Sequence, residues 1–129
     1  MYYHKIHFSL KEARTTLGII RADIDRMVLL KTELDEIGYD MYRHTFFGGL
    51  GPNGEGFHPP QLEELVEIIQ SIVERGIQIK NIDAGLIDFP HIRANGEEVY
   101  LCWKADEANI EYWHPIPDGF RGRRHIDEL

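Results

Sequence analysis

The residues best suited to chemistry lie in the C-terminal third of the chain. Asp88, Glu107 and His114 are candidate catalytic residues, because carboxylates and an imidazole can transfer protons as acids and bases. The same three residues are candidate ligands of a divalent metal, the cofactor that these side chains suggest. Structural roles are the alternative, since Asp88 could cap backbone amides and a single histidine is often a hydrogen-bonded structural residue.

Three further residues of this region are candidate ligand-binding residues: Trp103, Asp118 and Arg123. The planar guanidinium of Arg123 could bind a carboxylate or phosphate, and Gly119 would let backbone amides approach it. A small anion is therefore the expected ligand. Alternatively, this segment is a solvated tail that forms ion pairs with the second helix.

The dipeptide Asn95-Gly96 is a strong signal for a two-residue β-hairpin turn. Such a turn pairs Asp88 with Trp103. Because side chains alternate along a strand, Asp88 would then share a face with the apolar residues Ile92, Val99, Leu101 and Trp103. A carboxylate on a buried face needs a cation or several hydrogen-bond donors. The alternative is a bulge at Pro90 that turns Asp88 outward.

The register of the last predicted strand, residues 110–114, stays open, because the loop before it does not fix the pairing. In one register His114 shares the face of Asp88. In the other register Glu111 and Trp113 share it. The sequence therefore allows, but does not require, contact between Asp88 and His114.

Two helices must support this β module. Ser9 and Glu12 match a capping box at the start of the first helix. Behind it the apolar residues recur in steps of three and four, as in a heptad seam: Leu10, Ala13, Leu17, Ile20, Ile24 and Met27. Pro60 suits the first position of a second helix, and Gly76 suits its end.

We therefore expect an α+β fold, in which a long antiparallel helical hairpin precedes a small, mostly antiparallel β-sheet module. At 129 residues the chain fits a single domain, 1–129. Its expected parts are a helix (10–38 or longer), a glycine-rich loop (45–59), a helix (60–75), the β module (77–114) and a C-terminal tail (115–129). Gly49–Gly54 matches the letters of a dinucleotide-binding loop but lacks the preceding strand.

The two predicted helices differ in length. At 1.5 Å per residue the first is roughly 40–50 Å long and the second roughly 25 Å. A hairpin of the two would leave part of the first seam uncovered. We therefore expect a homodimer, formed as a coiled coil through the first helix.

Composition limits the function classes. The net charge of −8 opposes binding to nucleic acid and to anionic membranes. Cys102 is the only cysteine, so the chain cannot form an internal disulfide, and its strand-like setting favours a packed thiol over a nucleophile. The N-terminus lacks the apolar run of a signal peptide, and no stretch is apolar enough to span a membrane, so a cytoplasmic location is expected.

Several segments resemble a known family: Gly85–Pro90, Val99–Trp103, Tyr112–His114, Asp118–Arg123 and the opening Phe8–Ala13. Together they are similar to the bacterial and archaeal domain-of-unknown-function 2203 family over most of the chain. The chain departs from the family pattern at Asp106, where a glycine is usual. The resemblance implies no activity. It does imply that one constellation recurs: Asp88, Trp103, Glu107, His114, Asp118 and Arg123.

Three functional hypotheses remain. The first is a homo-oligomeric module that binds a small ligand or a partner through the polar and aromatic cluster of its β module. The alternative is a small metal-dependent or acid/base enzyme that uses Asp88, Glu107 and His114. The spaced motifs of common metalloproteases, P-loop proteins and serine hydrolases are missing from the sequence. In the third hypothesis the cluster only stabilises the sheet against the helices.

Overall fold

The computed structural model describes residues 1–47 and 59–129. The first helix, α1, spans Leu10–Glu36. Its predicted capping box is confirmed, since Ser9 Oγ accepts from the Glu12 amide and the Glu12 carboxylate accepts from the Ser9 amide. Gly38, with φ of 73°, follows the helix end, where the Tyr39 amide donates to the Leu34 carbonyl over 2.9 Å. The expected glycine-rich loop, including Gly49–Gly54, lies largely outside the described residues.

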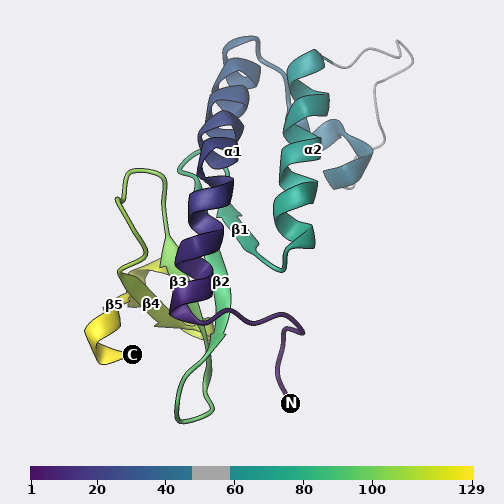
Figure 1. The fold of residues 1–129 in the computed structure, drawn as a ribbon. Coiled ribbons are helices and arrows are strands. Elements are labelled where there is room, and N and C mark those ends of the chain that lie inside the picture. Colours follow the sequence, from purple (N-terminus) through teal and green to yellow (C-terminus); the bar gives the residue numbers. More distant parts are fainter. Residues whose placement is uncertain (48–58) are drawn as a thin grey trace.

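The second long helix, α2, spans Pro60–Glu74. It lies beside the later part of α1 and runs in the opposite direction (Figure 1). In the described part of the segment that follows α1, residues 37–47, lie two short 3-10 helices, Met41–Arg43 and Thr45–Phe47. Gly76 ends the α2 region with a φ of 92°, and Ile6 packs so closely on it that any side chain there would collide.

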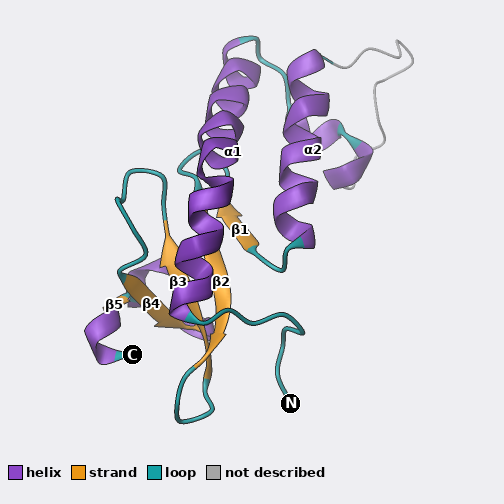
Figure 2. Ribbon diagram, in the orientation of Figure 1, coloured by secondary structure: helices purple, strands orange, loops and turns teal. Residues whose placement is uncertain are grey.

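Within residues 1–47 and 59–129, the strands form one antiparallel sheet of five strands in the order β1-β2-β3-β4-β5. The strands are β1 (Gln78–Asn81), β2 (Leu86–Ile92), β3 (Glu98–Trp103), β4 (Tyr112–Pro115) and β5 (Arg124–His125). Strand β1 lies beside the lower turns of α2, the other strands lie below α2, and α1 alone extends down across the sheet (Figure 2). The segregation of helices from an antiparallel sheet is an α+β arrangement, as the sequence predicts.

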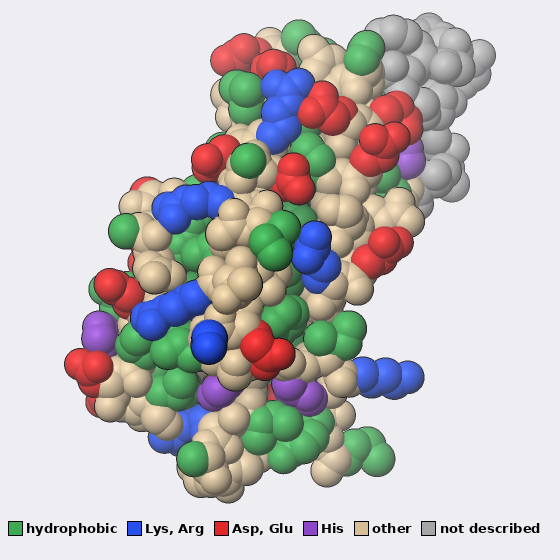
Figure 3. All heavy atoms as spheres, in the orientation of Figure 1, with side chains coloured by type: hydrophobic (Ala, Val, Ile, Leu, Met, Phe, Trp, Pro, Cys, Tyr) green, Lys and Arg blue, Asp and Glu red, His purple; other side chains and the backbone are tan. Residues whose placement is uncertain are grey.

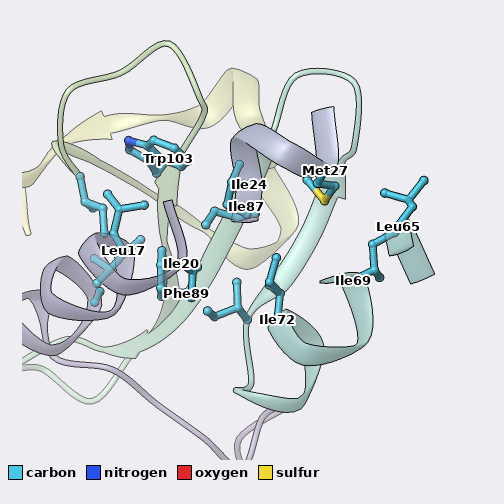
Figure 4. Packing of buried hydrophobic residues seen from close by; sticks show 14 of the residues in the cluster. Leu17, Ile20, Ile24, Met27, Leu65, Ile69, Ile72, Ile87, Phe89 and Trp103 are labelled. Atoms are coloured by element: carbon cyan, nitrogen blue, oxygen red, sulfur yellow. The ribbon is translucent and has the colours of Figure 1, made fainter. Parts of the chain in front are cut away.

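The hydrophobic core is continuous from the helix pair into the sheet. The early part of α1 places Leu17, Ile20 and Ile24 near the sheet residues Phe89 and Trp103, all of them buried (Figure 4). Farther along, Met27 of α1 belongs to the same cluster as the α2 residues Leu65, Ile69 and Ile72 (Figure 4).

The structure removes the physical reason for a coiled-coil homodimer. Seven seam residues of α1 are at most 2% exposed within a single chain: Ala13, Leu17, Ile20, Ile24, Met27, Leu30 and Leu34. The expectation of an uncovered seam was wrong because it considered only α2 as a partner. The sheet covers the part of α1 that α2 does not reach.

The predicted register of the β2–β3 hairpin was wrong by one residue. The Arg93 amide donates to the Glu97 carbonyl and the Gly96 amide to the Arg93 carbonyl, each over 2.8 Å, so the loop has three residues, 94–96. Gly96 has a φ of 90°, which suits the left-handed last position of such a loop. Asp88 therefore pairs with Cys102, and it is Ile87 that pairs with Trp103.

The segment expected as a C-terminal tail folds back on the sheet. It contains three short 3-10 helices, Ile116–Asp118, Phe120–Gly122 and Ile126–Glu128, as well as β5. On the surface, acidic and basic side chains are interspersed over the face that Figure 3 shows. Within the described residues, no helix is long and apolar enough to cross a membrane.

Candidate functional site

Three neighbouring strands bring Asp88, Cys102 and His114 together on the face of the sheet that points away from α1. Asp88 on β2 lies opposite Cys102 on β3, and His114 on β4 lies opposite Tyr100 on β3. Since Tyr100 and Cys102 are two residues apart, their side chains share a face. The alternation that buries Leu101 against α1 therefore directs this polar group to the other side.

The cluster of Asp88, Cys102 and His114 is compact and almost fully buried. One ligand-type atom from each residue lies within 4.8 Å of those from the other two. Asp88 Oδ2 and His114 Nε2 are 3.1 Å apart, and the three residues are only 1–2% exposed. The other carboxylate oxygen, Asp88 Oδ1, is buried and has no hydrogen-bond partner in the described structure. A buried polar atom without a partner is costly, so it points to a ligand.

The hydrogen bonds of His114 define which nitrogen faces the cluster. Nδ1 lies 2.8 Å from the Pro115 carbonyl oxygen, which can only accept, so Nδ1 carries a hydrogen. Nε2 is therefore the nitrogen directed at Asp88. Burial lowers the pKa of His114, but the hydrogen bonds to Asp88 and to Pro115 outweigh burial and raise the pKa above its usual value. A protonated His114 therefore donates from Nε2 to Asp88 Oδ2 over 3.1 Å.

Cys102 completes the cluster and is a residue that the sequence did not single out as a site residue. Burial raises the pKa of its thiol strongly, and the negative charge of Asp88 adds to this effect. A free Cys102 is therefore a neutral, packed thiol, in line with the expectation that it is not a nucleophile. A bound cation would be needed to stabilise its thiolate.

Glu107, the third candidate acid, lies outside this cluster. Its carboxylate forms an ion pair with Arg123 at 2.6 Å and accepts from the Lys104 amide at 2.9 Å. Arg123 also donates to the Cys102 carbonyl over 3.3 Å and stacks 4.1 Å from the centre of the Tyr112 ring. The Glu107–Arg123 pair thus connects the C-terminal segment to the turn after β3.

The remaining predicted residues are also separated from Asp88. Trp103 is buried on the opposite face, where its indole Nε1 donates to the Glu107 carbonyl over 3.0 Å. Asp118 is exposed and packs against Gly122, where any side chain would collide with the Cβ of Asp118. The expected constellation is therefore divided into a buried cluster with Asp88 and His114 and an ion pair of Glu107 with Arg123.

A small cavity of about 160 Å³ opens beside the buried cluster. Asp88, Cys102 and His114 all line it. The other lining residues come from the neighbouring strands and from the folded-back segment: Lys80, Leu86, Tyr100, Ile116, Gly119 and Phe120. The cluster is therefore accessible to a ligand of a few atoms.

The N-terminal segment supports one wall of the cavity. The Glu98 carboxylate accepts hydrogen bonds from the amides of Tyr3 at 2.7 Å and His4 at 3.0 Å, and lies 2.7 Å from His7 Nε2. His4 Nε2 in turn lies 2.7 Å from the hydroxyl of Tyr100, which lines the cavity. Glu98 thus holds the N-terminal segment beside this wall.

We expect acid to release the N-terminal segment through protonation of Glu98. Burial raises the pKa of this carboxyl, but the hydrogen bonds from His7 and the amides of Tyr3 and His4 outweigh burial and lower it below the usual value. A lowered pKa means that this stabilisation is complete above the unfolded-state pKa and is lost as pH falls through the folded-state pKa. Urea unfolding measured between pH 6 and pH 3 should therefore show Glu98→Gln less stable than the parent at pH 6. The two should converge toward pH 3, and a constant difference would contradict this assignment.

Comparison with known proteins gives one family match. The family model described as "Uncharacterized conserved protein (DUF2203)" matches residues 6–126. No curated protein and no solved structure matches the chain. The matched range includes the buried cluster, the cavity and the Glu107–Arg123 pair.

Proposed function

The chain belongs to the DUF2203 family of uncharacterized conserved proteins, and we propose that it binds a divalent transition metal through Asp88, Cys102 and His114. The observation that carries this proposal is the convergence of three buried ligand-type atoms within 4.8 Å, beside a carboxylate oxygen that has no partner in the described structure. The sequence suggested a metal site formed by Asp88, Glu107 and His114. The proposed site differs in that Cys102 takes the place of Glu107 as the third ligand.

The donor set suits zinc or another late transition metal. A thiolate, an imidazole and a carboxylate bind zinc at about 2.3, 2.0–2.1 and 2.0–2.2 Å, which places tetrahedral ligands about 3.5 Å apart. Ligand-type atoms that already lie within 4.8 Å of one another need only small side-chain movements to reach this spacing. Hard cations such as magnesium and calcium prefer sites built from oxygen alone, which this cluster is not.

The surroundings of His114 also fit a metal ligand. Histidines that bind metals usually donate their other ring N–H to a carbonyl or carboxylate, which fixes the ring and the tautomer. Here Nδ1 donates to the Pro115 carbonyl over 2.8 Å and leaves Nε2 facing the cluster. The ring is therefore already oriented for coordination.

The cavity supports a role in ligand binding or catalysis over a purely structural one. Structural zinc sites have four protein ligands, whereas catalytic sites have three and keep one position for water or substrate. Asp88, Cys102 and His114 provide three protein ligands, and all of them line the cavity of about 160 Å³. The function proposed for the chain is metal-dependent binding of a small molecule, with the metal available as a Lewis acid.

Metal uptake tests this proposal. Untagged protein is incubated with zinc, freed of excess by dialysis and assayed for metal. We expect about one zinc per chain, and His114→Gln should lose it, because a neutral amide replaces the coordinating nitrogen. His91→Gln is the matched control: the Nδ1 of His91 also hydrogen-bonds to a carbonyl, that of Phe8, at 2.7 Å, but His91 stands outside the cluster.

Zinc retained equally by both variants would place the metal elsewhere. Protein that takes up no zinc, with all variants folded, would instead favour a cluster that only stabilises the sheet.

A further inference from the structure

The cavity beside the metal cluster carries a positive charge at its rim. Lys80 lines the cavity and holds its ammonium nitrogen 4.7 Å from the centre of the Tyr100 ring. Across residues 1–47 and 59–129, Lys80 forms no ion pair. The cation at the rim is thus free to pair with a ligand.

The charges of the loaded site favour a ligand with one negative charge. A divalent metal bound by the Asp88 carboxylate, the Cys102 thiolate and a neutral His114 has no net charge. Lys80 then leaves the cavity with one uncompensated positive charge. A monoanion would balance this charge, whereas a neutral ligand would leave it and a dianion would exceed it.

The walls of the cavity favour a ligand with a short apolar part. Leu86, Ile116 and Phe120 contribute apolar side chains to the lining. The volume of about 160 Å³ holds a molecule of only a few heavy atoms. A small aliphatic carboxylate combines these properties, because it has one charged end that binds metals and ammonium groups and one end that packs on hydrocarbon.

We propose that the cavity binds a small monocarboxylate, with its carboxylate between the open metal position and Lys80 and its aliphatic end against Leu86, Ile116 and Phe120. This inference rests on the proposed metal site. It goes beyond that site by naming the ligand class and by assigning Lys80, which the sequence did not single out, as the residue that selects for negative charge.

Cobalt-loaded protein can test the inference, because the visible spectrum of cobalt(II) reports on ligands that enter its coordination sphere. Acetate, butyrate and phosphate are titrated separately, with butyramide as an uncharged match for butyrate. We expect butyrate to change the spectrum and to bind more tightly than acetate, since it buries more hydrocarbon. Lys80→Gln should weaken butyrate binding by about tenfold or more, the scale of a lost charge-assisted hydrogen bond.

Lys11→Gln serves as the control, because Lys11 is an exposed lysine of α1 that does not line the cavity. Cobalt content, measured in every variant, separates loss of the metal from loss of the anion. If cobalt is bound normally but butyrate does not change its spectrum, the carboxylate inference alone is overturned. The same holds if Lys80→Gln binds butyrate as tightly as the parent protein does. Equal responses to butyrate and butyramide would do the same, as would a response to phosphate only. Absence of bound cobalt would overturn the metal site and this inference with it.

Discussion

Replacing Cys102 with serine is expected to lower zinc affinity by more than about 100-fold. Changes in residues that merely support a metal ligand cost 10–100-fold, so the loss of a coordinating thiolate should cost more. Serine is close to cysteine in size, and its hydroxyl could donate a hydrogen bond to the Asp88 carboxylate. The metal-free protein should therefore fold, which separates the loss of a ligand from the loss of the structure.

A competition titration against a chromophoric zinc chelator measures this affinity, and urea unfolding in EDTA measures the stability of the same samples. His91→Gln again controls for general effects of a substitution on the sheet. If the serine variant kept its affinity within a few-fold of the parent, the thiol would not be a ligand. The site would then have to be assigned to Asp88 and His114 without Cys102.

Replacing Asp88 with alanine is expected to destabilise the metal-free protein by about 3–5 kcal/mol, the cost of removing one partner from a buried ion pair. His114 is 2% exposed and has Asp88 as the acceptor for its Nε2–H, so without Asp88 this buried nitrogen would lose its charged partner. Asp88→Asn should cost less, because the amide Nδ2 can donate to the Nε2 of a neutral His114. Asp88 would thus stabilise the fold as well as bind the metal.

Urea unfolding at pH 6 in EDTA gives these free energies directly. Asp106→Ala is the surface control: this carboxylate pairs with Lys104 but is 72% exposed, so its loss should cost at most about 1 kcal/mol. If Asp88→Ala cost no more than Asp106→Ala, the Asp88–His114 pair would not stabilise the sheet.

Local and periodic features of the fold were predictable from the sequence. The capping box of Ser9 and Glu12 depends on residues three apart, and it is present. The seam of α1 depends on helical spacing, and its residues are buried. The partner of this seam was not predictable in the same way. Whether a sheet or a second chain covers the early part of α1 depends on contacts between residues far apart in the chain.

The candidate site was predicted only in part, because its residues depend on strand register. Asn95-Gly96 fits a two-residue turn and also the end of a three-residue loop, and the difference moves every side chain of a strand to the other face. The two-residue turn placed Asp88 beside Trp103 and on the apolar face. The three-residue loop places it beside Cys102 and turns it away from α1.

Other parts of the site had no local signal at all. A single cysteine in an apolar strand is usually only packed, so Cys102 gave no indication of a ligand. The contact between Asp88 and His114 needed a register for β4 that the preceding loop did not set. The ion pair of Glu107 with Arg123 likewise joins residues from separate turns.

The measurement that tests the metal site most directly is X-ray absorption at the zinc edge of the zinc-loaded protein. It counts and identifies the atoms bound to the metal. We predict one sulfur at about 2.3 Å and nitrogen or oxygen ligands at about 2.0–2.2 Å, of which one type is imidazole. The sulfur should disappear in Cys102→Ser. A spectrum with only nitrogen and oxygen ligands in the parent protein would contradict the site of Asp88, Cys102 and His114.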